Sequence, residues 1–140
     1  MNATRCISAI DLAGAITVPC AAASLNLCAR ARNPMAGLES KIFCTPAVSV
    51  VTNGVSDDAN GVDLSVTDLW LQMARAGDVF AMHYSLDGRS WRMVRLFRLA
   101  VAPAIRVGLV AQCPVGPGAT VDFLSFSVEN RTLQNLRGGK

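Results

Sequence analysis

Alternation of large apolar residues with small or polar ones is clearest along residues 79–85 of the chain. Large apolar side chains occupy one set of alternate positions in this run, namely Phe80, Met82 and Tyr84. A period of two is typical of a β-strand with one buried face. A second short run at 69–75 precedes it, and the connection between the two runs contains a glycine. Together these features predict an antiparallel β-hairpin.

Further runs rich in β-branched and aromatic residues lie at 47–52, 105–113 and 120–128, and each predicts a strand. The first run ends at Asn53-Gly54, a dipeptide typical of tight hairpin turns. The Pro- and Gly-rich stretch 114–118 lies between the last two runs and predicts a turn. Short strands joined by such turns are typical of a β-sandwich or barrel, so we expect an all-β antiparallel fold.

Two stretches between these strands are interpreted mainly from their context. Residues 55–68 contain four Asp, one Asn and one Gly, and they predict a surface loop because these residue types favour turns. In 91–99 the apolar residues fall at helical spacing, whereas a face with a period of two is interrupted by Arg95. Periodicity slightly favours a helix. The short length of the run and the strands on both sides favour a strand, which is our prediction.

The chain divides into three regions by composition. Residues 1–35 are rich in Ala and Cys and show no clean period, so we expect a weakly structured segment or partial strands there. Residues 36–130 carry the β-type runs and form the predicted sandwich domain. Residues 131–140 are polar, end in Gly-Gly-Lys and predict a frayed tail. An apolar content of 51% with 16% charged residues is typical of a globular domain.

A series of short motifs follows a fixed order in the second half of the chain. The motifs are Leu69-Trp70-Leu71, Arg75-Ala76-Gly77-Asp78, Tyr84-Ser85-Leu86-Asp87-Gly88, Trp91, Val107-Gly108-Leu109, Pro114-Val115-Gly116 and Val121-Asp122-Phe123. Over about residues 36–128 the chain resembles a poorly characterised family with a concanavalin A-like lectin/glucanase fold, which includes the fungal regulation-of-enolase protein. The resemblance implies a concanavalin-like jelly roll. Members of that family carry further N-terminal strands, so it also implies a shortened sandwich that lacks some of them.

Composition and charge exclude several classes of protein. The net charge of +3, from 13 basic and 10 acidic residues, is too low for a nucleic-acid surface, which needs a concentrated basic face. No stretch approaches the roughly 20 apolar residues of a membrane helix. The five Cys are irregularly spaced and include no C-x-x-C pair, which predicts free thiols in a reducing compartment. We therefore expect a cytoplasmic protein that binds neither nucleic acid nor membranes and has no cofactor.

The chain lacks the residue patterns of common catalytic sites. A retaining glucanase needs two carboxylates about 5–5.5 Å apart, but Glu39, Asp122 and Glu129 are isolated from one another. His83, the single histidine, has no nucleophile or carboxylate that the sequence places beside it, and we expect a structural or surface role. The Asp residues of 55–68 have the oxygen ligands that calcium prefers, but a solvated loop is the favoured interpretation. We predict no catalytic residue and no metal site.

Large side chains with a polar tip are the candidates for ligand binding, because sugar sites combine an aromatic platform with a few polar groups. These candidates are Trp70, Tyr84 and Trp91, with Asp57 as a polar candidate from the acidic stretch. Packing in the core or at its rim is the competing interpretation for each aromatic residue.

We predict from these observations a non-catalytic binding or regulatory domain that acts through contacts with a protein partner. The partner that the resemblance implies, by the name of the family member alone, is a glycolytic enzyme. Two alternatives stay open. One is a carbohydrate-binding or glycoside-hydrolase-related domain, and the other is a shortened family member without an independent function.

Overall fold

The computed structural model describes residues 5–18, 22–32, 42–44, 46–115 and 120–140. These residues contain eleven β-strands and no helix. The strands are β1 (Arg5–Val18), β2 (Ala22–Arg32), β3 (Ile42–Cys44), β4 (Ala47–Thr52), β5 (Val55–Asn60), β6 (Leu64–Val66), β7 (Asp68–Ala76), β8 (Val79–Ser85), β9 (Arg92–Arg98), β10 (Ile105–Val115) and β11 (Thr120–Glu129).

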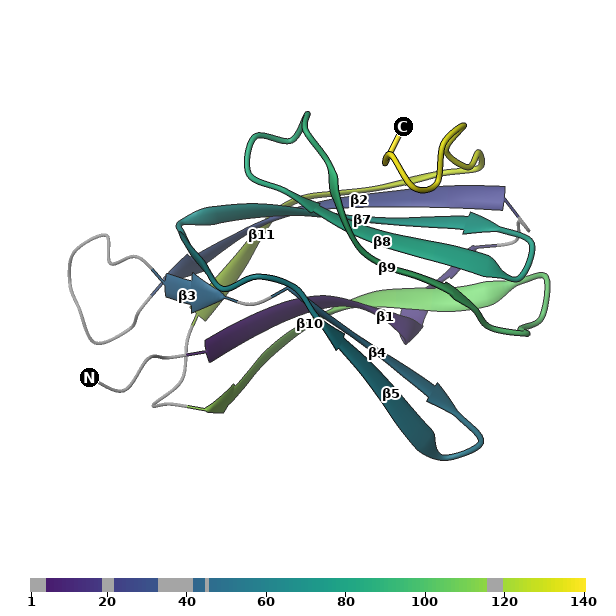
Figure 1. The fold of residues 1–140 in the computed structure, drawn as a ribbon, viewed down its shortest axis with the longest axis horizontal. Helices are drawn as coiled ribbons and strands as arrows, with labels where there is room; N and C mark the ends of the chain where they lie inside the picture. Colours follow the sequence, from purple (N-terminus) through teal and green to yellow (C-terminus); the bar gives the residue numbers. More distant parts are fainter. Residues whose placement is uncertain (1–4, 19–21, 33–41, 45, 116–119) are drawn as a thin grey trace.

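Two sheets and a ribbon arise from these strands (Figure 1). Five strands form one sheet in the order β11-β2-β7-β8-β9, four form a second in the order β10-β1-β3-β6, and β4 and β5 form a two-stranded ribbon. Neighbouring strands are antiparallel, except that β1 and β3 are parallel. The two larger sheets face each other as the layers of a sandwich (Figure 1). The predicted all-β antiparallel sandwich is confirmed.

The inner face of the five-stranded sheet, turned toward β1 and β10, carries the hydrophobic core. Leu25, Met73 and Phe80 are at most 1% exposed and cluster with Val107 of β10. The first three residues occupy inward positions of β2, β7 and β8, in agreement with the alternation along β8. The Phe80 ring stacks on Phe97 of β9, with 5.5 Å between the centroids. Removal of these side chains from water is the main source of stability in such a sandwich.

A buried arginine closes one end of this core. Arg75 is 2% exposed, and its guanidinium lies 5.5 Å from the centre of the Phe80 ring. Its Nε donates to the carbonyl of Gly77 (2.8 Å), and its two Nη atoms donate to the carbonyls of Pro103 (2.8 Å) and Ala102 (2.9 Å). The side chain therefore joins the β7–β8 turn to the connection between β9 and β10.

The predicted hairpin and most of the predicted strands are confirmed. The runs at 69–75 and 79–85 are β7 and β8, and the run that ends at Asn53-Gly54 is β4. The last two runs are β10 and β11. Of the turn predicted at 114–118, the first two residues belong to β10 and the rest lie outside the described residues.

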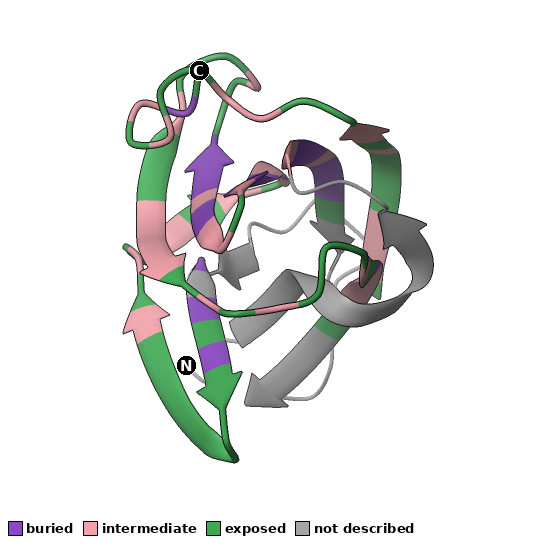
Figure 2. Ribbon diagram, turned by 90° about the vertical axis from the view of Figure 1, so that its right-hand side faces the viewer, coloured by how far each residue is buried: buried purple, intermediate pink, exposed green. Residues whose placement is uncertain are grey.

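The prediction of a surface loop at 55–68 is wrong, because this stretch contains β5 and β6. β5 pairs with β4 along its whole length across a turn in which Asn53 (φ 53°) and Gly54 (φ 77°) both have positive φ. Positive φ at both central residues is typical of a type I′ hairpin turn. The residues of β5 are exposed apart from half-buried Ala59 (Figure 2). Its Asp residues therefore keep their contact with water, and the β-branched partner strand imposes the extended conformation.

Residues 5–18 and 22–32 form two long strands, where partial strands or a weakly structured segment were predicted for 1–35. β1 lies between β10 and β3, and β2 lies between β11 and β7, so this region contributes to both sheets. Along β2 the inward positions hold Ala23, Leu25 and Leu27, and the outward positions hold small or polar residues. Because some inward side chains are as small as Ala23, inward and outward residues differ little in size, and the alternation is weak in the sequence. The boundary predicted at 35/36 lies outside the described residues.

The ambiguous run at 91–99 is a strand, β9, as predicted from its context. Its pairing with β8 shifts by one residue: Met82 lies opposite Arg95, whereas His83 lies opposite Met93. Val94 is thus the extra residue of a β-bulge, which inverts the alternation at that point. The bulge explains why a strict period of two failed along this strand.

Candidate binding face

The outer face of the five-stranded sheet, turned away from the core, carries several polar residues that are nevertheless buried. Residues of this face with less than a tenth of their surface exposed are Ser24, Cys28, Gln72, Ala74, Ala81, His83 and Ser85. Two segments rise on this side of the sheet: the connection between β8 and β9, and the C-terminal residues 130–140 (Figure 1). These segments, rather than the second sheet, separate the outer face from water.

The C-terminal segment, residues 130–140, contacts the outer face at His83 and Trp91. His83 Nε2 lies 2.8 Å from the carbonyl oxygen of Leu136, and the imidazole donates because a carbonyl only accepts. Gly139 is buried, and a Cβ at its position would lie 2.5 Å from Trp91 Cβ and 3.4 Å from His83 Cδ2. The glycine is therefore required by the close approach of the segment to Trp91.

The same segment is held in a compact turn by its own backbone. The amide of Lys140 donates to the carbonyl of Asn135 (3.2 Å), and the amide of Asn135 donates to the carbonyl of Lys140. The side chain of Asn135 accepts from the amides of Arg137 and Gly138 at 3.1 and 2.9 Å. The prediction of a frayed tail is wrong, because the turn forms its own hydrogen bonds and docks on the sheet.

The connection between β8 and β9 is organised by Asp87. Its Oδ1 accepts from the Ser85 hydroxyl (2.8 Å) and from the amides of Arg89 (2.8 Å) and Ser90 (2.7 Å), and its Oδ2 accepts from the Ser90 hydroxyl (2.9 Å). The amides of Ser90 and Arg89, with help from the two hydroxyls, hold the pKa of the Asp87 carboxyl well below its usual value. This carboxylate is fully used in shaping the turn.

The predicted aromatic candidates separate between the two faces. Trp70 lies on the outer face beneath the β8–β9 connection, where a Cβ on Gly88 would be 3.1 Å from its Nε1. Trp91 lies on the same side, against Gly139. Tyr84 is on the inner face and is 4% exposed. The structure therefore brings the two tryptophans to one side of the sheet and places the tyrosine in the core.

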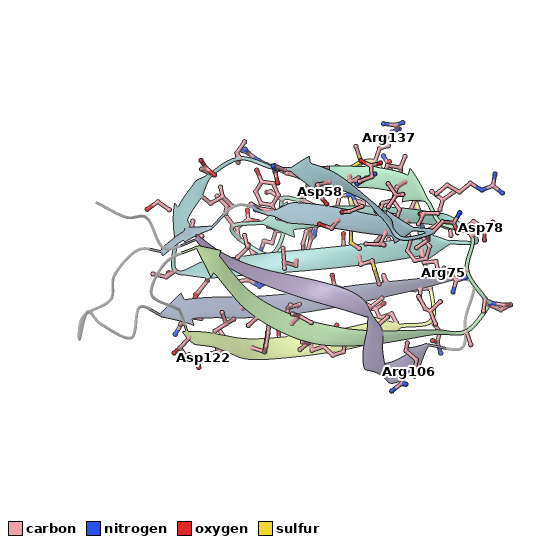
Figure 3. All side chains as sticks on the ribbon, turned by 90° about the horizontal axis from the view of Figure 1, so that it is seen from below. Asp58, Arg75, Asp78, Arg106, Asp122 and Arg137 are labelled. Carbon is pink, nitrogen blue, oxygen red and sulfur yellow. The ribbon has the colours of Figure 1, made fainter. Side chains whose placement is uncertain are left out.

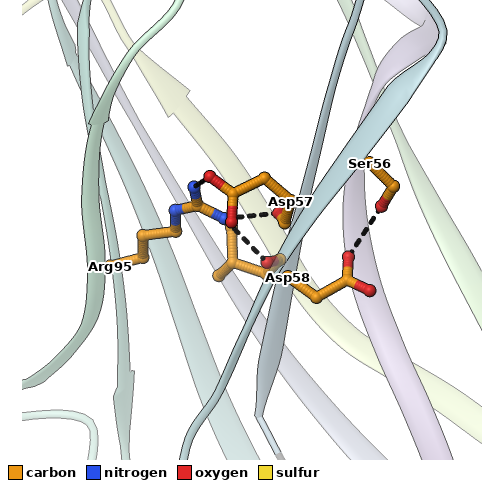
Figure 4. A network of polar contacts seen from close by, with 5 residues as sticks. Ser56, Asp57, Asp58 and Arg95 are labelled. Carbon is orange, nitrogen blue, oxygen red and sulfur yellow. Dashed lines mark hydrogen bonds and ion pairs between the residues drawn. The ribbon is translucent and has the colours of Figure 1, made fainter.

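Asp57 lies on the two-stranded ribbon, where its carboxylate faces Arg95 of β9 (Figure 4). Its carboxylate lies 2.6 Å from the Arg95 guanidinium, which also donates to the carbonyls of Asp57 (2.5 Å) and Val48 (3.4 Å). The adjacent Asp58 accepts from the Ser56 hydroxyl at 2.8 Å. Asp57 thus attaches the ribbon to the edge of the five-stranded sheet.

The sequence does not identify two residues of the outer face that the structure brings to attention. Gln72 is not among the predicted site residues, and His83 is predicted to have a structural or surface role. Gln72 Nε2 donates to Asn26 Oδ1 at 3.0 Å. Among the described residues, neither Gln72 Oε1 nor His83 Nδ1 has a hydrogen-bond partner, although both atoms are buried. Burial lowers the pKa of His83, and the bond to the Leu136 carbonyl opposes this only in part, which favours the neutral imidazole. The one sequence feature that could have identified them is a polar residue at an outward position of an otherwise apolar strand.

The described residues provide no cluster suited to metal binding. Asp58, Asp78 and Asp122 lie at separate places on the molecule (Figure 3). Within the described part of the chain, no group of three or more His, Cys, Asp or Glu could hold a metal ion. Cys28 is a free, buried thiol, and burial is the main cause that raises its pKa. The same part of the chain has no helix long and apolar enough to cross a membrane.

Comparison with known proteins identifies a family without a known activity. A family model described as a protein of unknown function, DUF1349, matches residues 35–131. A solved structure of a functionally unknown protein from Saccharomyces cerevisiae is similar in fold, with a TM-score of 0.61 and 19% identity over 81% of this chain and 71% of that chain. No curated protein matches. Since the family model covers more than half of the chain, this protein belongs to the DUF1349 family.

Proposed function

We propose that this protein is a non-catalytic binding domain, and that the outer face of its five-stranded sheet receives a polypeptide segment of a partner protein. The observation that carries the proposal is the docking of the chain's own residues 130–140 on this face. A surface that binds one polypeptide segment within the chain has the groups needed to bind another from outside. The tightly occupied carboxylate of Asp87 supports a binding role over a catalytic one.

Two contacts indicate what kind of segment this face accepts. His83 donates to the carbonyl of Leu136, a backbone group that every polypeptide offers. Trp91 lies so close to Gly139 that the segment needs a residue without a side chain at that point. The expected partner segment therefore forms a turn with glycine opposite Trp91, and its backbone provides the acceptor for His83.

The test uses a fluorescent peptide with the sequence of residues 130–140 and the full chain with Gly139→Ala. The added methyl group would displace the tethered segment, so the variant should bind the free peptide. The wild type should bind it at least about tenfold more weakly, because its own segment competes at an effective concentration on the order of millimolar. Fluorescence anisotropy measures both affinities.

Gly77→Ala is the matched control for this experiment. Gly77 has a similar positive φ of 62°, but nothing lies within 4 Å of a Cβ at that position. The control should therefore bind the peptide as weakly as the wild type. The proposal would be contradicted by a Gly139→Ala chain that fails to bind the peptide although amide exchange shows that its own segment has been released.

The resemblance to the concanavalin-like family extends the proposal to a glycolytic enzyme as the partner, in the cytoplasm. The support for this partner is the ordered series of motifs that includes Trp70 and Trp91. The free thiol of Cys28 supports a reducing compartment. Calorimetric titration of purified enolase into the Gly139→Ala chain should give saturable heat, and its absence would remove enolase as the partner.

Carbohydrate binding is the second candidate function. The observation in its favour is that Trp70 and Trp91 lie on one side of the sheet, the side that also carries Gln72. Against it, the Trp70 indole is already covered by Gly88. A glycan array would decide: specific binding that is lost in both Trp70→Ala and Trp91→Ala would favour a sugar ligand over a polypeptide.

A shortened chain without an independent function is the third candidate. The presence of β1 and β2 in the two sheets counts against it, because residues 5–32 supply strands at the centre of each sheet. A monomeric protein with a single cooperative unfolding transition would exclude this candidate. A soluble aggregate without such a transition would favour it.

A further inference from the structure

We propose that Gln72 Oε1 and His83 Nδ1 together form a subsite for a neutral group with two hydrogen-bond donors, either a primary carboxamide or a pair of adjacent hydroxyls. The subsite lies on the outer face, and the C-terminal segment closes over it. This inference deepens the proposed function, on which it rests, by naming the chemistry that the face recognises in a ligand.

The two side chains are direct neighbours across two strands. Gln72 of β7 and His83 of β8 are opposite each other in the register of the sheet. Their side chains point to the same face and are 6% and 1% exposed. Residues directly opposite each other in an antiparallel pair have Cβ atoms about 4.5–5.5 Å apart. In the proposed subsite, one small group contacts both side chains at once.

Both atoms without a partner are acceptors. Gln72 donates one N–H of its amide to Asn26 Oδ1, and the carbonyl oxygen of the same amide has no partner. His83 uses its Nε2 proton on the Leu136 carbonyl, so Nδ1 of the neutral ring carries a lone pair. Buried acceptors without a donor are unfavourable and are rare in folded proteins. The pair therefore selects a ligand group that donates twice.

The charges around the outer face favour a neutral donor over an ammonium group. A buried cation needs a nearby anion to offset the loss of hydration. The nearby carboxylates are engaged: Asp68 pairs with Arg30, Asp87 binds its own turn, and Glu129 pairs with Arg131. A carboxamide or a diol supplies the two donors without adding a charge.

The experiment uses the single histidine of the chain as a reporter. The full chain is labelled with ¹⁵N-histidine, so that one imidazole gives the whole signal. Acetamide and ethylene glycol represent the two donor chemistries, and N,N-dimethylacetamide, which has no N–H, is the matched control. Acetamide or ethylene glycol should shift the Nδ1 resonance upfield in a saturable way, and the control compound should not.

Gln72→Met keeps a similar shape but removes the acceptor, so it should reduce the apparent affinity at least about tenfold. Asn60→Met, at an exposed position of β5, should leave the response unchanged. A response to acetamide assigns a carboxamide ligand, and a response to ethylene glycol assigns a diol; either supports the subsite. The proposal is overturned if neither compound acts, if the control compound acts equally, if methylammonium alone acts, or if Gln72→Met responds like the wild type. The peptide experiment does not use Gln72, so the two proposals can fail separately.

Discussion

The inner and outer faces of the five-stranded sheet are built from alternate residues of the same strands, yet they are closed in different ways. On the inner face, Leu25 and Phe80 pack against the second sheet and need only to be removed from water. On the outer face, Gln72 and His83 are just as buried, but each polar atom also needs a partner. The chain's own C-terminal segment supplies only part of what they need. An apolar face needs only well-fitting neighbours, whereas a polar face on which some atoms lack hydrogen-bond partners can still bind a ligand.

The largest expected effect on stability comes from removing a large side chain of the inner face. Phe80→Ala should lower the free energy of unfolding by about 3–5 kcal/mol, because it leaves a cavity and removes the stacking on Phe97. Urea unfolding followed by circular dichroism measures the change. Leu124→Ala, at a position that is 49% exposed, should stay within about 0.5 kcal/mol of the wild type. Equal losses in the two variants would mean that the inner face is not the main core.

Among the described residues of the inner face, Arg75 carries a buried charge, and replacing it tests whether that charge contributes to the stability of the core. Arg75→Met should cost about 2–3 kcal/mol, because hydrogen bonds from a charged donor to three carbonyls are lost. The same unfolding experiment measures it, and Arg106→Met, at an exposed position, is the control. An Arg75→Met protein as stable as the wild type would show that the inner face does not need this contact.

The outer face should be the part that responds to mild acid. Because burial lowers the pKa of His83, the unfolded chain takes up the proton more readily than the folded one. The stability that His83 contributes is therefore present above its usual pKa of 6.5 and is lost as the pH falls through that value toward the lower pKa of the folded state. Urea unfolding at about pH 7.5 and about pH 5.5 should show this loss in the wild type. His83→Gln should reduce it, and an equal loss in the variant would contradict the assignment.

The ribbon of β4 and β5 belongs to neither face, and the smallest change in stability is expected there. Asp57→Asn should cost about 0.2–1 kcal/mol, since the side chain that pairs with Arg95 is 74% exposed. Amide exchange should accelerate in the ribbon and stay unchanged in β7 and β8. Asp78→Asn, which removes the longer 3.4 Å pair with Arg98, should have a smaller effect. Faster exchange throughout the sheet in Asp57→Asn would mean that the ribbon is part of the core.

The strands that could be predicted from sequence are those whose alternation uses large side chains. β8 was clear because the large apolar side chains Phe80, Met82 and Tyr84 alternate with residues that are small or polar. β2 alternates as well, but with Ala23 and other small residues, and the pattern was missed. β5 is extended because its partner strand pairs with it, which its own acidic residues do not indicate. Local sequence predicts a strand only where burial is strong enough to select the residues.

The candidate site is formed by contacts between residues that are far apart in the sequence. Trp70 and Trp91 were singled out for their chemistry, and they do lie on one side of the sheet. The importance of His83 arises from a carbonyl 53 residues away in the chain, and that of Gln72 from a strand 46 residues away. In each contact the two residues are too far apart in the sequence for a local pattern to connect them, so these contacts could be found only in the folded structure.

The place of β2 in its sheet also bears on how the chain is made. β2 lies between β7 and β11, and β11 begins only at Thr120. While the ribosome is still synthesising the intervening residues, β2 has one neighbour at most, and its other edge is open to unwanted pairing. Pairings between distant segments also slow folding, to the range of about milliseconds to seconds in comparable β-proteins. We therefore expect the nascent chain to depend on chaperones until its last strand has emerged.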